Sequence, residues 1–302
     1  MPDTQPLPAL EWLLRFSTAR RIGEWRRWLA EDLGATELAG TSYASALAAS
    51  IGAKTAGAWL ATPASLEARL DHVRLRDRGL LRLPAAQRLQ LIEDFARNFG
   101  PGLVLHEAGE RGFLLEGGPV ASAATVDPAR LLDADVGPAL PAAAQAGELR
   151  RLAAEIEMWL HSAALNSERE QSGQRRITSL WLWGGGADAA AAWRGAGDIH
   201  GGDPWLIALA GERGVSAVPA RFEQLPADEH AVVELAPMSG TPQESLGALE
   251  SNWFEPLRAA LSAGTLDVLN LVANDKTFVV RARAGWRFWR ARRGWLAALA
   301  EA

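Results

Sequence analysis

The segment from Glu155 to Gly186 joins a helical pattern to a short apolar run that ends in three glycines. Its first part repeats apolar residues at helical spacing, namely Ile156, Trp159 and Leu160. After a polar turn, Ser179–Trp183 reads Ser-Leu-Trp-Leu-Trp, and three glycines follow it, Gly184, Gly185 and Gly186. Such a run predicts a buried strand whose end passes close to another group. Because open α/β sheets bind ligands at strand ends, we expect a site here.

Helix and strand patterns alternate through the C-terminal half of the chain. Strand patterns occur at Val215–Pro219, Ala231–Ala236 and Leu266–Ala273, and helical patterns cover residues 203–213 and 243–262. The strands are apolar over most of their length, which is typical of strands buried on both faces. We therefore predict an α/β fold with a mainly parallel sheet and helices on both of its faces.

The N-terminal half has a different character. Residues 9–60 have mostly helical spacing, and a helix is predicted from Pro84 to Gly100. Its apolar stripe consists of Leu89, Ile92, Phe95 and Phe99. Residues 103–117 predict a hairpin, and 127–145 form a loop rich in Pro, Ala and Asp. We expect a domain boundary in that loop. Residues 1–145 would form a helical region with an α+β lobe, and 146–302 an α/β lobe with an aromatic and basic C-terminal segment.

The amino-acid composition argues against several classes of protein. The chain has 302 residues, 48% of them apolar, a formal net charge of −5 and no cysteine. A core of ordinary size is expected, whereas a dedicated nucleic-acid or membrane-surface binder is not. Disulfides and thiolate metal sites are excluded. The start of the chain lacks a signal-peptide pattern and no run is long enough to span a membrane, so we expect a cytoplasmic bacterial protein.

Asn166 and Arg169 lie three residues apart on the turn before the apolar run. An amide and a planar guanidinium together suit a carboxylate or phosphate oxygen. The alternative is structural: Asn166 caps a helix end, and Arg169 pairs with Glu168 or Glu170 in solvent. Gly184–Gly186 can likewise hold an anion with backbone N–H groups or simply form a tight turn.

Neither the histidines nor the glycines complete a known catalytic motif. The five histidines have no metal-ligand spacing, and the glycine run lacks the residues of a Walker loop or dinucleotide fingerprint. Asp198, His200 and Asp203 form a possible ligand set for Mn²⁺ or Zn²⁺. However, Asp203 before Pro204 also predicts a helix N-cap. We therefore expect no metal and no other cofactor.

The C-terminal segment interleaves arginines with Trp286, Phe288, Trp289 and Trp295. This pattern suits an acidic protein partner or single-stranded nucleic acid, although the acidic chain disfavours the latter. The alternative is an amphipathic ending, in which the aromatic rings pack on the sheet and the arginines face water.

The succession His161, Asn166, Arg169, Gly173 and then Ser179–Gly186 resembles the RpfE-type family of bacterial regulatory proteins. It is also similar to a segment of archaeal-type cofactor-independent phosphoglycerate mutase. Glu110–Leu115 resembles the segment around a substrate-lobe arginine of that mutase, which here is Arg111. The resemblance extends over about residues 60 to 280. It implies a reduced alkaline-phosphatase-like α/β fold with an inserted substrate lobe.

The metal ligands that the resemblance implies are largely missing. Val232 stands where the mutase has a histidine, Met238 where it has an aspartate, and Lys276 follows Asp275 in place of a histidine. Two divalent ions need such ligands, so mutase turnover by that mechanism is not expected.

Our first hypothesis is a non-catalytic relative of the mutases with a regulatory role. It would bind a small phosphorylated or carboxylated metabolite through Arg111, Asn166, Arg169 and Gly184–Gly186, with Lys276 as a fixed cation. The alternatives are a metal-dependent phosphomutase or phosphatase and a protein-interaction module that uses the C-terminal segment.

Overall fold

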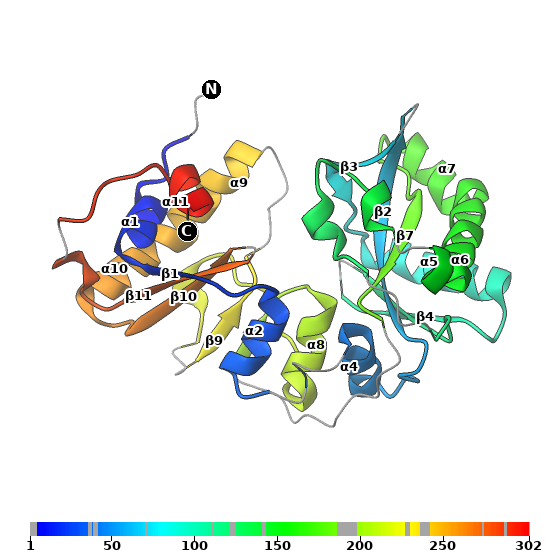
Figure 1. The fold of residues 1–302 in the computed structure, drawn as a ribbon, viewed down its shortest axis with the longest axis horizontal. Coiled ribbons are helices and arrows are strands. Elements are labelled where there is room, and N and C mark those ends of the chain that lie inside the picture. Colours follow the sequence, from blue (N-terminus) through cyan, green and yellow to red (C-terminus); the bar gives the residue numbers. More distant parts are fainter. Residues whose placement is uncertain are drawn as a thin grey trace. The chain divides into compact units, whose positions relative to one another are not determined.

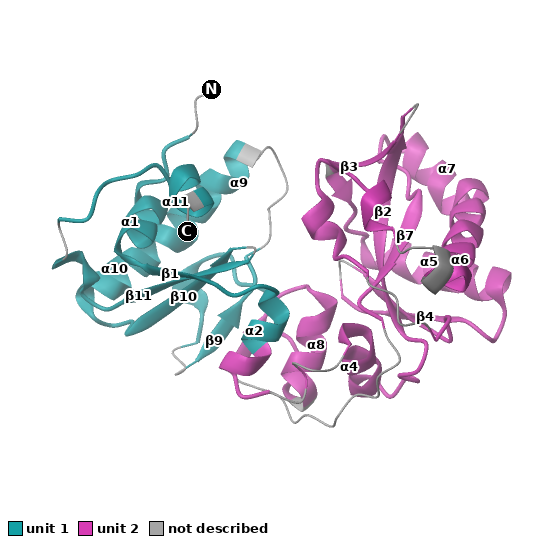
Figure 2. Cartoon of the chain, in the orientation of Figure 1, with its two compact units in different colours: residues 1–29, 217–302 teal, residues 30–216 magenta. Residues whose placement is uncertain are grey.

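The computed structural model divides the chain into two compact units (Figure 2). Unit 1 consists of residues 1–29 and 217–302, and unit 2 of residues 30–216. The structure describes residues 5–35, 38, 42–69, 72–109, 112–120, 125–140, 143–185, 198–226, 230–235, 242–273, 275–286 and 289–301. Residues 145 and 146, where the sequence predicts a domain boundary, both belong to unit 2.

Unit 2 contains a six-stranded sheet built around the long strand β2 (Trp59–Ala68). The strand order is β4-β5-β2-β3-β6, and β7 also pairs with β2. The remaining bounds are β3 (Val73–Leu80), β4 (Val104–Glu107), β5 (Phe113–Glu116), β6 (Ala134–Asp135) and β7 (Ser179–Trp183). β7 pairs with β2, and every one of its residues is buried.

Helices cover both faces of this sheet (Figure 1). On one face, Leu91, Phe95 and Ile156 pack with Trp59 and Phe113 of the strands. These apolar helix residues come from α5 (Ala85–Phe99) and α6 (Ala143–Ser162), and α7 (Ala164–Gln171) follows. On the other face lie α4 (Tyr43–Ser50) and α8 (Pro204–Ala210). Tyr43 of α4 contacts the rings of Trp183 and Trp205 edge-on. Unit 2 also contains β8 (Asp198–His200) and 3-10 helices at Pro128–Leu131, Gly137–Ala139 and Gly211–Arg213.

Unit 1 is a three-stranded sheet packed against helices. The strand order is β1 (Thr18–Arg21), β11 (Lys276–Arg281) and β10 (Val268–Ala273). Phe278 and Val280 of β11 pack in a core with Leu13 of α1 and Leu261 of α10. The helices are α1 (Pro8–Phe16), α9 (Pro242–Leu249), the π-helical turn η5 (Glu250–Phe254), α10 (Glu255–Ala263) and α11 (Trp295–Glu301). Also present are β9 (Ala231–Val233) and 3-10 helices at Phe222–Gln224 and Ala284–Trp286, while α2 (Trp25–Asp32) crosses the unit boundary.

The predicted mainly parallel, alkaline-phosphatase-like sheet is wrong. In the two sheets above, every pair of neighbouring strands is antiparallel. A parallel bridge joins His200 to Ser216. The alternation of helices with apolar strands in the C-terminal half is what predicts a parallel sheet. A strand buried on both faces has a continuous apolar sequence whichever way its neighbours run, so the pattern indicates burial and not direction.

Candidate functional site

Asn166 lies in the first turn of α7 with 1% of its surface exposed. Its Nδ2 donates to the carbonyls of Leu160, at 2.7 Å, and of Ile177, at 2.8 Å. Its Oδ1 accepts the N–H of Ile177 at 2.8 Å. The side chain therefore joins the last turn of α6 to the segment that enters β7. Both ends of the amide are committed to backbone groups.

Arg169 lies one helical turn later and is 4% exposed. Its Nε donates to the carbonyl of Arg175 at 2.8 Å, and its Nη1 donates to Oε1 of Gln87. Neither carboxylate next to it in sequence is its partner, because Glu168 bonds Gln90 and Glu170 bonds Arg176. Among the described residues, no carboxylate forms an ion pair with Arg169. Desolvation by burial lowers the pKa of Arg169 below the ordinary arginine value.

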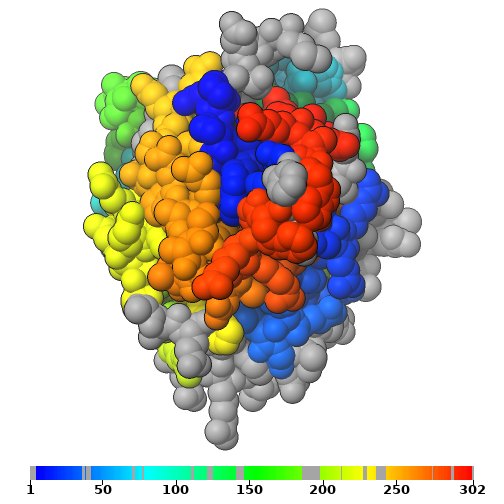
Figure 3. Space-filling model, turned by 90° about the vertical axis from the view of Figure 1, so that its left-hand side faces the viewer, coloured from blue at the N-terminus to red at the C-terminus, as the bar shows by residue number. Residues whose placement is uncertain are grey.

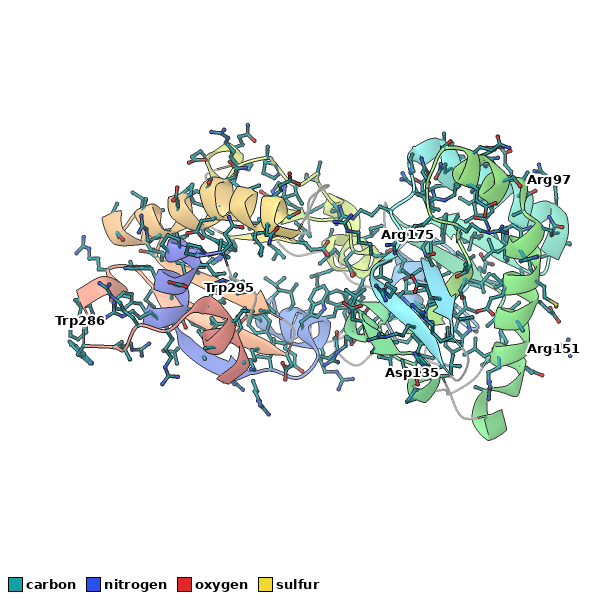
Figure 4. The ribbon with its side chains drawn as sticks, turned by 90° about the horizontal axis from the view of Figure 1, so that it is seen from above. Arg97, Asp135, Arg151, Arg175, Trp286 and Trp295 are labelled. Carbon is teal, nitrogen blue, oxygen red and sulfur yellow. The ribbon has the colours of Figure 1, made fainter. Side chains whose placement is uncertain are left out.

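The hydrogen-bond partners of Arg169 are neutral acceptors rather than carboxylates. Gln87 is in the first turn of α5, and no side chain caps the N-terminus of that helix. The Nε2 of Gln87 donates to Oε1 of Gln174 at 3.1 Å. Arg175, labelled in Figure 4, is exposed beside this group. The role of Gln87 was not predicted from the sequence, because 82 positions separate it from Arg169.

The glycine turn lies at the other end of β7. Thr178 and the five residues of β7 separate Ile177 from Gly184, and this distance along the sequence corresponds to about 23 Å of extended chain. Gly184 has φ of +63°, donates its N–H to Thr125 and accepts the N–H of Ala44. A Cβ on Gly185 would come within 2.4 Å of the Trp59 ring. The bare backbone therefore allows close packing against β2 and α4.

The other predicted site residues have partners of their own or lie outside the described residues. Lys276 belongs to unit 1, where its Nζ donates to the carbonyls of Leu299, at 2.7 Å, and Ala300, at 3.0 Å, in the last turn of α11. Cations near a helix C-terminus stabilise it in this way. Arg111 and Gly186 lie outside the described residues.

The possible metal ligands have other roles or no common site. Asp203 accepts the N–H of Trp205 at 2.9 Å and caps α8, as its position before Pro204 predicts. Within the described part of the chain, no group of three or more His, Asp or Glu residues is arranged to hold a metal ion. In the same part of the chain, no helix is long and apolar enough to cross a bilayer.

Comparison with known protein families and with curated proteins finds no match. Among solved structures, the chain is similar to the cofactor-independent phosphoglycerate mutase from Thermoplasma acidophilum DSM 1728. The two share 17% sequence identity at a TM-score of 0.37, over 92% of this chain and 83% of that chain. The similarity is distant. At this level it establishes no shared active site, so the chemistry of the candidate site rests on its own geometry.

Proposed function

We propose that this chain is a non-catalytic protein that binds a small anion of the phosphate or carboxylate class beside Arg169, in a regulatory role. One observation carries the proposal: a guanidinium that is 4% exposed bonds a backbone carbonyl and an amide oxygen, but no carboxylate of the described residues. Removing a charge from water costs several kcal/mol unless another charge compensates it. A bound anion would supply that compensation.

The hydrogen-bonding capacity of Arg169 supports the same conclusion. The guanidinium has five N–H donors, of which Nε and Nη1 have partners. Its Nη2 donates to no group in the described part of the chain, and two parallel N–H groups of a guanidinium bind a phosphate or carboxylate well. The uncapped N-terminus of α5, which carries Gln87, adds the favourable end of a helix dipole. Asn166 then acts as a positioning residue that holds α7 in place.

Titration calorimetry with inorganic phosphate, 2-phosphoglycerate and 3-phosphoglycerate tests this proposal. We expect at least one of them to bind, and Arg169→Met to weaken binding by about tenfold or more, because it removes the charge and keeps much of the volume. The control is Arg151→Met, which removes an exposed arginine that pairs with Glu155 within α6. The absence of heat from all three compounds, or equal binding by wild type and Arg169→Met, would contradict the proposal.

A second assay addresses the absence of catalysis. Purified protein supplemented with Mn²⁺ or Zn²⁺ is expected to show no phosphatase or mutase turnover, since the implied metal ligands are replaced at Val232, Met238 and Lys276. Turnover that depends on Asp198 or His200 would instead support a metal-dependent enzyme.

A further inference from the structure

A groove in unit 1 lies where α1 leads into β1 and the C-terminal segment leaves β11. It has a volume of about 430 Å³, and its lining includes Phe16, Thr18, Val279, Arg281 and Trp286. Thr18 pairs with Val279 across the β1–β11 ladder, so both side chains lie on one face of the sheet. Phe278 and Val280 lie on the opposite face, in the core. The strand residues of the groove therefore face away from that core, whereas Phe16 and Ala284 of its lining belong to the core.

Two exposed tryptophans lie at this groove. Trp286 is 64% exposed and Trp289 is 62% exposed, and their rings meet edge to face with centroids 5.2 Å apart. Figure 4 shows Trp286 at the outer edge of unit 1, and Figure 3 shows the C-terminal segment beside α1 on one face of that unit. Large aromatic side chains that remain exposed as a pair are typical of interaction surfaces. By contrast, Trp295 packs against the core of unit 1.

One end of the groove carries positive charge. Arg281 lines the groove and is exposed at the end of β11, and Arg20 of β1 lies opposite Thr277, on the same face as Arg281. The guanidinium of Arg283 lies beside Gly264, at the C-terminal end of α10. None of these three arginines forms an ion pair with a described carboxylate. The chain as a whole is acidic, with a formal net charge of −5, so this basic surface is a local feature. Charge complementarity therefore favours an acidic partner.

The edge of the sheet favours a peptide as that partner. β1 is the outer strand in the order β1-β11-β10, and its four residues are all exposed. An outer strand presents backbone N–H and C=O groups that an extended peptide can pair with.

We infer that this surface binds an acidic peptide segment of another protein. An apolar side chain of the peptide occupies the groove against Phe16 and Trp286, and its carboxylates pair with Arg20 and Arg281. Trp289 extends the aromatic contact. This surface belongs to unit 1, whereas the anion site of the proposed function belongs to unit 2. Either proposal can therefore fail without the other.

Fluorescence anisotropy provides the test. The probe is a fluorescein-labelled peptide of about twelve residues, in which Asp and Glu flank a Leu-Phe pair. The control peptide replaces each acid with its amide. We expect weaker binding, by about tenfold or more, for the amide peptide and for the variants Trp286→Ala and Arg20→Gln/Arg281→Gln. Added salt should weaken binding of the acidic peptide to the wild type.

The matched control is Arg97→Gln/Arg151→Gln, which changes the net charge by the same amount at exposed positions of unit 2. It is expected to bind the acidic peptide as wild type does. Circular dichroism melts confirm that each variant is folded, and Trp289→Ala provides a second aromatic variant if Trp286→Ala is unfolded.

Several outcomes would overturn the inference. The first is no binding at about 1 mM protein, and the second is equal binding of the acidic and amide peptides. The third is an equal loss of affinity for the acidic peptide in both arginine double variants. Tighter binding of oligo(dT) than of the peptide would assign the surface to nucleic acid. Self-association in sedimentation experiments that Trp286→Ala abolishes would assign it to a second copy of the chain.

Discussion

Asn166 contributes most clearly to stability among the polar residues of unit 2. One side chain satisfies the carbonyl of Leu160 and both backbone groups of Ile177. These partners end α6 and precede β7, so the residue determines how helix and strand are joined. The same bonds leave little of the amide for a ligand, so the proposed anion site depends on Arg169 rather than on Asn166.

Substitution of Asn166 by Ala should destabilise the protein by about 2–3 kcal/mol, because it leaves buried backbone groups without partners. Urea unfolding monitored by circular dichroism measures the loss. The control is Asn98→Ala, since Asn98 is exposed and bonds only the carbonyl of Asp94 among the described residues. We expect it to change stability by no more than about 0.5 kcal/mol. Equal effects of the two substitutions would contradict this role for Asn166.

The ionisation of Glu116 is expected to make the stability of the β4–β5 hairpin depend on pH. Its Oε2 lies 2.8 Å from Nε2 of His106, and Lys54 lies 3.7 Å from its other oxygen. The hydrogen bond with His106, with help from the charges of His106 and Lys54, lowers the pKa of Glu116 below the ordinary value of 4.5 despite its desolvation. The stabilisation is therefore fully present above pH 4.5 and is lost as pH falls through the folded-state pKa.

Glu116→Gln should cost about 0.5–1 kcal/mol near pH 7, and the difference from wild type should shrink below pH 4.5. Urea unfolding of both proteins across this pH range measures the effect. A difference that stays constant with pH would show that the charge of Glu116 does not stabilise the fold.

At the scale of elements, the N-terminus of α1 is capped by a carboxylate from a distant part of the chain. Leu7 at its N-cap provides no side-chain hydrogen bond. Instead, Glu250 accepts the N–H of Ala9 and, at 3.2 Å, that of Leu10. Glu250 begins the π-helical turn η5 and is 6% exposed. A negative charge at this position also suits the helix dipole.

Glu250→Ala should therefore lower the stability of unit 1 by about 1–2 kcal/mol, as the loss of an N-cap does. Hydrogen exchange at the first turn of α1 provides a local readout, and protection there should fall most. Glu93→Ala, at an exposed position of α5, is the matched control. Unchanged protection in Glu250→Ala would mean that α1 is held by apolar packing alone.

At the scale of the whole molecule, the two compact units make the fold discontinuous in sequence. Residues 1–29 return to pack with residues 217–302, and residues 30–216 lie between them in the chain. β1, from the first segment, pairs with β11, from the last. A division at residue 145 would break both of the larger sheets, because β2 pairs with β7 and β1 pairs with β11 across it.

A fragment of residues 30–216 should fold on its own and unfold cooperatively in urea. A fragment of residues 1–145 should not, since it lacks β7, which pairs with Leu60–Ala64 of β2. Dispersion of amide signals in NMR spectra distinguishes the two results. A well-folded fragment of residues 1–145 would instead support the domain boundary predicted from the sequence.

Local signals in the sequence were sufficient for several elements. Asp203 before Pro204 predicted the start of α8, Gly100 predicted the end of α5, and the pattern of residues 103–117 predicted the β4–β5 hairpin. Each depends on a few neighbouring residues. The prediction of the apolar face of α5 was less accurate, because Leu89 is 55% exposed and Leu91 is buried instead.

The sequence by itself therefore determined where many elements begin and end and that β7 is buried. Only the tertiary structure decided that its neighbours run antiparallel, since burial produces the same apolar run in either direction. It also decided that Gln87, rather than a neighbouring glutamate, contacts Arg169. Such a contact depends on which segments pack together, and nothing in the spacing of nearby residues encodes it.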